Sequence, residues 1–195
     1  MRSNLSAMLL SLYFLLALSL SALPSCAVYN AAVDERGIST QAQDEWIEAN
    51  VKKLLYDDEE VKLGDIAVHA YEGRVYLVGE YDYPRQVDRA VKLAKSVAHV
   101  VSVQSVFWEK KPHEACGTFD DLSLRTKIRT ELIGRGGVTA PNVDVAVVQC
   151  NVVLLGILGS KAELAQAVDS AKSVEGSASV KSLLRLPGNT GRATK

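Results

Sequence analysis

The sequence predicts an α+β fold that consists of two tandem αββαβ domains behind an N-terminal signal segment. Three observations support this: an ungapped internal repeat, the same order of helix and strand patterns in both copies, and an apolar segment near the N-terminus that ends at a cysteine. The chain has 195 residues and a formal net charge of −1. A charge so close to zero provides no field that would attract nucleic acid, so we expect no nucleic-acid partner.

The repeat becomes visible when the chain is shifted by 77 residues against itself. Identical residues then coincide without a gap, and hydrophobic positions keep the same phase. The identical positions include Asp44 and Asp121, Leu55 and Leu132, Val75 and Val152, Leu77 and Leu154, Gly79 and Gly156, and the segments 94–97 and 171–174. An ungapped series of this kind indicates duplication of one structural unit.

Each copy is predicted to begin with a helix, at 44–57 and at 120–134, because apolar residues recur there at helical spacing. Asp44 and Asp121 lie near these expected helix starts, where a carboxylate can cap free backbone N–H groups and oppose the helix dipole. The apolar positions are Ile47, Val51 and Leu55 in the first copy, and Leu124, Ile128 and Leu132 in the second.

A hairpin, a second helix and a last strand complete each copy. In the first copy the hairpin strands are expected at 66–71 and 75–79, with the turn at Glu72-Gly73, where glycine tolerates a positive φ. In the second copy we expect the turn at Cys150-Asn151, with Asn151 in the left-handed region. The second helices are expected at 84–98 and 161–175, and the last strands at 101–108 and 178–186.

The N-terminus is predicted to be a lipoprotein signal peptide, since Arg2 precedes an apolar run and the segment Leu23-Pro24-Ser25-Cys26 resembles a bacterial lipobox. This resemblance implies cleavage before Cys26 and acylation of its sulfur. The alternative is an uncleaved transmembrane anchor, because the run 5–23 is just long enough to span a bilayer. Ala27, in place of aspartate, implies the outer membrane, with the protein facing the periplasm.

These features divide the chain into six segments. We predict a signal peptide at 1–25, a lipidated tether at 26–43, a first domain at 44–109, a linker at 110–118, a second domain at 119–188 and a disordered tail at 189–195.

The predicted hairpin, Gly73-Arg74-Val75-Tyr76-Leu77-Val78-Gly79, and the segment 126–132 resemble the BON domain, and the whole chain resembles the outer-membrane lipoproteins that carry two BON domains. The resemblance implies a protein that is not an enzyme, has no cofactor, contacts anionic phospholipid through the first helix of its second domain and supports envelope integrity. It also implies an aromatic residue near position 123, where this chain has Ser123.

The residues of that helix fit such a surface. Beside the core stripe, apolar side chains fall together on one side. Arg125 and Arg129 flank them and Lys127 lies further round, and an apolar patch edged by arginine is what an interfacial helix requires. The candidate phospholipid-binding residues are Phe119, Leu122, Arg125, Lys127, Arg129 and Ile133. The alternative is that the apolar residues pack against the first domain or an oligomer partner. Two other functions stay open: a scaffold that recruits outer-membrane assembly proteins, and sensing of small ions.

Other chemistry finds little support in the sequence. Cys116 and Cys150 form an even pair once Cys26 is lipidated, and both a disulfide and two free thiols are consistent with the sequence. No cluster of cysteine and histidine has the spacing of a metal site, so we expect no metal. The three histidines have no neighbouring nucleophile, and no hydrolase or phosphate-binding motif occurs, so we expect no catalysis.

Overall fold

The computed structural model describes residues 34–61, 64, 66–111 and 116–188. The predicted signal peptide, Cys26 and the tail 189–195 lie outside this range. Within the described residues, every helix is too short or too polar to span a bilayer.

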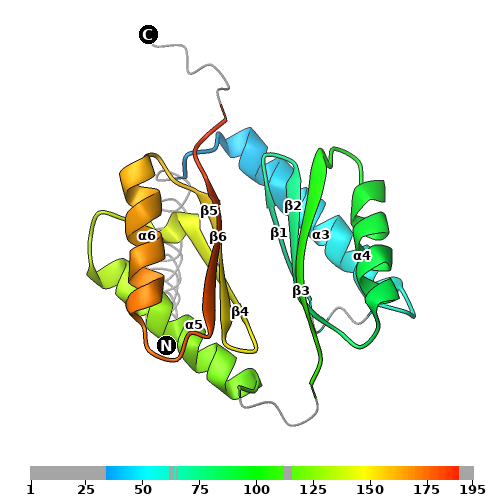
Figure 1. The fold of residues 1–195 in the computed structure, drawn as a ribbon. Coiled ribbons are helices and arrows are strands. Elements are labelled where there is room, and N and C mark those ends of the chain that lie inside the picture. Colours follow the sequence, from blue (N-terminus) through cyan, green and yellow to red (C-terminus); the bar gives the residue numbers. More distant parts are fainter. Residues whose placement is uncertain (1–33, 62–63, 65, 112–115, 189–195) are drawn as a thin grey trace, which may run out of the picture. The chain divides into compact units, whose positions relative to one another are not determined.

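In the first domain two helices cover one face of a three-stranded sheet (Figure 1). Strand β1 is antiparallel to β2 and β3 is parallel to β2, so β2 lies in the centre. Strand β3 joins the sheet through the crossover helix α4, which a parallel connection requires. The elements are α3 (Ile38–Asp57), β1 (Ile66–Tyr71), β2 (Arg74–Tyr81), α4 (Pro84–Ser96) and β3 (Ser102–Glu109).

The second domain repeats this arrangement, with a sheet of order β4-β5-β6. Its elements are α5 (Thr118–Gly134), a short 3-10 helix η2 (Ala140–Asn142), β4 (Val143–Val148), β5 (Asn151–Ile157), α6 (Lys161–Ser173) and β6 (Ser179–Arg185). The predicted α+β fold of two tandem αββαβ domains is therefore confirmed. The apolar helix positions named above form the cores: Ile47, Val51, Leu55, Leu124, Ile128 and Leu132 are all buried.

The first helix begins earlier than predicted, at Ile38 rather than Asp44. Residues 38–43 were expected to belong to the tether, but they form the first turns of the helix, whose N-cap is the extended residue Gly37. Just before the helix, Nη1 of Arg36 donates to the carbonyl of Ala70 in β1 at 3.1 Å and so holds this segment against the sheet. Asp44 consequently lies inside the helix and does not cap it. Its buried carboxylate accepts hydrogen bonds from the backbone N–H groups of Glu72 and Gly73, both at 2.8 Å.

Asp121 has the same role in the second domain. Although it lies in the first turn of α5, its carboxylate accepts from the backbone N–H groups of Gln149 and Cys150, at 3.0 and 2.7 Å. The turn is therefore Gln149-Cys150, where both residues have a positive φ. The expected position, Cys150-Asn151, was wrong, because Asn151 already belongs to β5 and instead braces the turn by donating to the carbonyl of Val148.

The two sheets pack against each other through the faces that the helices leave uncovered. The described residues from Glu35 onward form one compact unit, and a third hydrophobic cluster joins side chains of both sheets. Packing of this kind makes each sheet apolar on both faces. The buried members of the cluster are Tyr71, Tyr76, Val78, Val106, Ala146, Val153, Leu155 and Ile157.

Candidate functional site

Helix α5 presents an apolar surface to solvent on the side opposite its core stripe. At 100° per residue, Phe119, Leu122 and Ile133 lie within one sector of the helix. Their exposed fractions are 82%, 55% and 71%. The structure thus brings the three predicted apolar residues together on one exposed side, and none of them packs into the domain core. Exposed apolar groups of this size are typical of interaction surfaces.

The polar groups between these side chains are satisfied inside the helix. The hydroxyl of Thr126 donates to the carbonyl of Leu122 at 2.9 Å, and that of Thr130 donates to the carbonyl of Thr126 at 3.0 Å. A hydroxyl that already has a partner costs less to remove from water than a free one. The outer side of α5 can therefore enter a less polar environment without leaving these groups unpaired.

The acidic residues of α5 are occupied elsewhere. Asp120 accepts from the backbone N–H of Gly117 at 3.0 Å, and Glu131 forms an ion pair with Arg135. We define the outer surface of α5 as Phe119, Leu122, Thr126, Lys127, Arg129, Thr130 and Ile133.

The three predicted basic residues differ in their surroundings. Lys127 is exposed, and Arg129 is 56% exposed while its Nη2 lies 3.6 Å from Oδ1 of Asp144. Arg125 is half-buried, and its Nε is buried without a hydrogen-bond partner. Lys127 and Arg129 are therefore accessible to an external anion, whereas Arg125 contributes mainly to packing.

A polar cluster that the sequence did not reveal adjoins Arg129. Oδ2 of Asp144, on β4, accepts a hydrogen bond from the hydroxyl of Tyr71, and Nδ1 of His69 lies 3.4 Å from it. Tyr71 and His69 belong to β1 of the first domain, so Asp144 contacts the first domain on one side and Arg129 of α5 on the other. One pattern in the sequence could have indicated this cluster. Side chains alternate between the two faces along a strand, which places His69, Tyr71 and Asp144 on the sheet faces away from the helices.

The environment of this cluster keeps Asp144 ionised and Tyr71 neutral. Burial of Asp144 acts to raise its pKa. Interactions with His69, Tyr71 and Arg129 outweigh burial, and the pKa of Asp144 lies below its ordinary value of 3.8. Burial, followed by the nearby Asp144 carboxylate, raises the pKa of Tyr71 well above 10.0. At neutral pH the cluster therefore contains a carboxylate and a phenol that donates to it.

Two further contacts link the domains through their hairpin turns. The Glu72 carboxylate accepts from Arg185 at the end of β6. At the other turn, Nε2 of Gln149 donates to Oε1 of Glu80 at 2.9 Å and to the carbonyl of Glu109 at 2.8 Å. Each turn thus contacts the end of a strand in the other domain.

Cys116 and Cys150 form a disulfide, with their Cα atoms 5.8 Å apart. The bridge joins the residue before the N-cap of α5 to the turn that Asp121 holds, so two links connect α5 to this hairpin. The two sulfur atoms and an Asp121 carboxylate oxygen lie within 4.8 Å of one another, which is close enough for metal ligands. Sulfur atoms bonded to each other are not thiolates, however, and this group is not a metal site in the oxidised protein.

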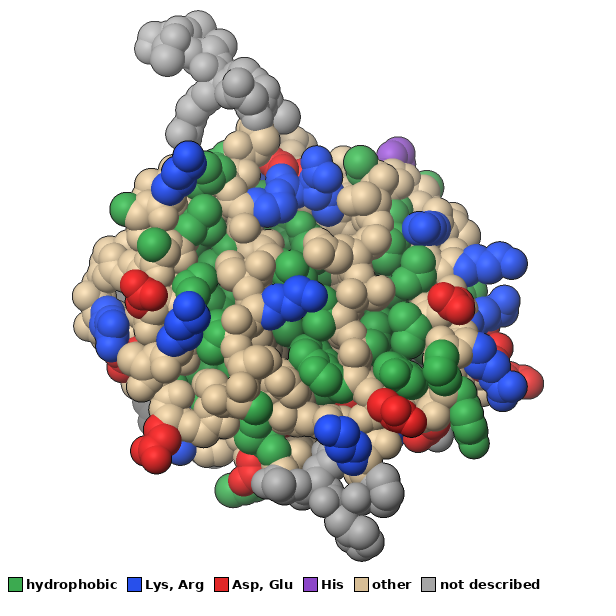
Figure 2. Space-filling view, viewed as in Figure 1, with side chains coloured by type: hydrophobic (Ala, Val, Ile, Leu, Met, Phe, Trp, Pro, Cys, Tyr) green, Lys and Arg blue, Asp and Glu red, His purple; other side chains and the backbone are tan. Residues whose placement is uncertain are grey.

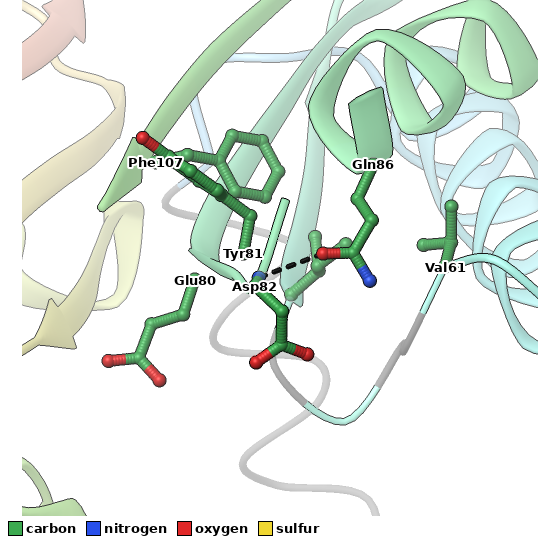
Figure 3. A pocket seen from close by; sticks show the side chains of 7 residues that line it. Val61, Glu80, Tyr81, Asp82, Gln86 and Phe107 are labelled. Carbon is green, nitrogen blue, oxygen red and sulfur yellow. Dashed lines mark hydrogen bonds between the residues drawn. The ribbon is translucent and has the colours of Figure 1, made fainter. Parts of the chain in front are cut away.

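One cavity among the described residues is too small to hold a substrate. It lies between α4 and the loop that follows α3 and has a volume of about 10 Å³, which suits one water molecule (Figure 3). There the Oε1 of Gln86 accepts from the backbone N–H of Asp82 at 2.8 Å, and its Nε2 donates to the carbonyl of Glu60 at 2.9 Å. Gln86 thereby joins two loops, a structural role.

Charge on the face shown in Figure 2 is distributed broadly. Lys and Arg side chains are spread over this face among hydrophobic and polar groups, with acidic side chains between them. Electrostatic attraction to an anionic surface must therefore come from local groups such as those of α5, because the net charge of the chain is −1.

Comparisons with known proteins identify the family. The BON domain model matches residues 43–107 and 120–188, so the chain belongs to the BON-domain family. It is 32% identical over 144 residues to the osmotically-inducible protein Y of Escherichia coli (strain K12), covering 73% of this chain and 72% of that protein. It is 29% identical over 146 residues to the outer membrane lipoprotein DolP of Haemophilus influenzae (strain ATCC 51907 / DSM 11121 / KW20 / Rd), covering 74% and 75%.

These findings confirm the predicted resemblance to proteins that carry two BON domains, among which DolP is a similar relative. The BON family and these relatives are not known enzymes, and the similarity to DolP supports an envelope-associated protein. One solved structure that was matched is the C-terminal domain of CdsD, the structural protein of the type III secretion system of Chlamydia trachomatis. The match has 16% sequence identity and a TM-score of 0.30, and it covers 74% of this chain and 67% of that chain. That score is too low to inform the fold or the function.

Proposed function

We propose that this protein is a lipoprotein of the outer membrane, anchored through Cys26 and facing the periplasm, that binds anionic phospholipid through α5 and supports envelope integrity. The observation that carries the proposal is the outer surface of α5, where three exposed apolar side chains lie beside Arg129 and the exposed Lys127 lies further round the helix. The similarity to a relative named outer membrane lipoprotein supports the anchor and the location.

Two forces act together at such a surface. Burying a large apolar side chain contributes about 1.5–3 kcal/mol, so Phe119, Leu122 and Ile133 provide several kcal/mol if they enter the acyl boundary even in part. Each basic residue close to an anionic surface adds about 1 kcal/mol. Lys127 and Arg129 therefore favour anionic over zwitterionic lipid.

Lipidation makes a weak headgroup interaction sufficient. Two acyl chains hold a protein stably at a membrane, and the folded part then meets the surface at a high effective concentration. In this arrangement α5 has to orient the second domain and select anionic regions, while the acyl chains provide the attachment.

The test is sedimentation with vesicles of phosphatidylglycerol or phosphatidylcholine, using the chain from Ala27 onward, which retains the compact unit that begins at Glu35. We expect salt-sensitive binding to phosphatidylglycerol. The variant Lys127→Gln/Arg129→Gln should bind about 30-fold more weakly, since two contacts of about 1 kcal/mol each are lost. Lys161→Gln/Lys172→Gln, on the exposed side of α6, is the charge-matched control and should bind like the wild type.

The apolar contribution has its own pair of variants. Phe119→Ser/Ile133→Ser should weaken binding to phosphatidylglycerol, whereas Ile38→Ser/Tyr56→Ser, which changes equally exposed apolar residues of α3, should leave it unchanged. If the folded wild-type chain fails to sediment with either vesicle at low salt, lipid binding by α5 is wrong. The alternative prediction, a scaffold that recruits outer-membrane assembly proteins through the same surface, would then be favoured.

A further inference from the structure

Arg129 belongs to two arrangements at once. It is part of the outer surface of α5, and it also faces Asp144 of β4 across 3.6 Å. The side chain of Arg129 is 56% exposed and that of Asp144 is 37% exposed, so an external anion can approach the guanidinium from solvent.

We propose that Asp144 regulates phospholipid binding by competing with the lipid phosphate for Arg129, an inference that rests on the proposed function of α5. In the unbound protein Arg129 is paired with Asp144. At an anionic membrane the guanidinium turns to a phosphate, which offers shorter and better-aligned hydrogen bonds than a carboxylate at 3.6 Å.

The two partners are held with unequal strength, and this makes the exchange feasible. Asp144 keeps two other interactions, the hydrogen bond from Tyr71 and the contact with His69 at 3.4 Å, so its position does not depend on Arg129. Arg129 has no second ion pair among the described residues, and an exposed pair shifts an equilibrium only about two- to fivefold. Breaking this pair therefore costs little.

The charge of Asp144 persists over the relevant pH range. Its pKa lies below 3.8 because interactions with its neighbours outweigh the effect of burial, so the carboxylate remains charged at neutral and mildly acidic pH. Asp144 therefore opposes the approach of a phosphate to Arg129 under ordinary conditions, and it lowers the affinity of α5 for weakly anionic surfaces.

The experiment measures binding of the chain from Ala27 onward to phosphatidylglycerol vesicles at low salt. Asp144→Asn removes the charge and retains an oxygen that can accept from Tyr71. We expect it to bind about two- to fivefold more tightly than the wild type, the range that an exposed ion pair allows. Asp169→Asn, on the exposed side of α6, removes an equal charge from the same domain and should bind like the wild type.

A double-mutant cycle separates competition from a general change in charge. In an Arg129→Gln background, Asp144→Asn should produce no gain in binding. Tyr71→Phe removes the hydroxyl bond between the domains but leaves the charge of Asp144, so it should not tighten binding. Thermal unfolding of every variant verifies folding, and Asp144→Ser serves in place of Asp144→Asn if the amide destabilises the chain.

The outcomes distinguish this inference from the function on which it rests. If the wild type binds phosphatidylglycerol vesicles but Asp144→Asn binds no more tightly, or gains as much in the Arg129→Gln background, competition by Asp144 is refuted and lipid binding stands. If the folded wild type does not bind these vesicles, both proposals fall together.

Discussion

Replacing Asp44 by alanine is expected to be one of the most damaging single changes in the first domain. Asp44 is 2% exposed, and its carboxylate accepts three hydrogen bonds of 2.8 Å, from the backbone N–H groups of Glu72 and Gly73 and from Arg36. Each bond to a charged acceptor contributes about 1.5–3 kcal/mol, and breaking a buried ion pair costs about 3–5 kcal/mol. Because the three bonds share one carboxylate they do not add fully, and we expect a loss of about 4 kcal/mol.

The second domain provides the comparison. Asp121 accepts from the N–H groups of Gln149 and Cys150, and the Cys116–Cys150 disulfide also ties this turn to α5. Asp121→Ala should therefore cost about 2 kcal/mol in the oxidised protein, since no ion pair with arginine is lost and the covalent link remains. Reduction of the disulfide should make the effect of Asp121→Ala larger.

For Asp44→Ala the assay is urea unfolding monitored by tryptophan fluorescence, because both tryptophans, Trp46 and Trp108, belong to the first domain. For Asp121→Ala, unfolding is monitored by far-UV circular dichroism, which reports on the helices of both domains. The midpoint and slope give the change in the free energy of unfolding. Asp88→Ala, at an exposed aspartate of α4 in the same domain, is the control. If Asp44→Ala lowered the free energy of unfolding no more than this control does, the claim that Asp44 joins α3 to the hairpin would be wrong.

Two further predictions concern stability. Hydrogen bonding from Arg89 lowers the pKa of Asp58 below 3.8, so this carboxylate stabilises the fold above that pH and the contribution is lost as the pH falls through the lowered pKa. The difference in urea midpoint between the wild type and Asp58→Asn should therefore shrink on acidification. A difference that stays constant with pH would contradict this prediction. Gly156 has a φ of 137°, and a Cβ added there would lie 2.0 Å from a backbone oxygen of η2, so Gly156→Ala should lower the melting temperature by many degrees. Gly134→Ala is the control and should not lower it, because no atom lies within 4 Å of a Cβ added at that position. Equal melting temperatures for the two variants would refute the steric argument.

The sequence was sufficient to predict the elements and the exposed side of α5. Periodicity reports on residues that are close along the chain, and the repeat allowed each copy to be interpreted with the help of the other. Rotation of 100° per residue placed Phe119, Leu122 and Ile133 together, and the structure has them exposed on one side. The same reasoning could not rank the basic residues, because the burial of Arg125 and the pairing of Arg129 depend on neighbouring strands.

Only the tertiary structure revealed what Asp44 and Asp121 do. Local reasoning placed them at helix starts, where aspartate commonly caps, but the backbone N–H groups that they bind lie 28 or more positions away along the chain, at the hairpin turns. The disulfide depends in the same way on the approach of the turn to the start of α5. Separation along the sequence contains no information about such distances.

The packing of the two sheets was likewise decided by the tertiary structure. The sequence alone determined that this protein is a duplicated αββαβ unit whose first helix carries an apolar core stripe in each copy, because spacing and identity are properties of the chain itself. Tyr71 meets Asp144 only because the two uncovered apolar sheet faces pack together and exclude water. This contact is what links the first domain to Arg129.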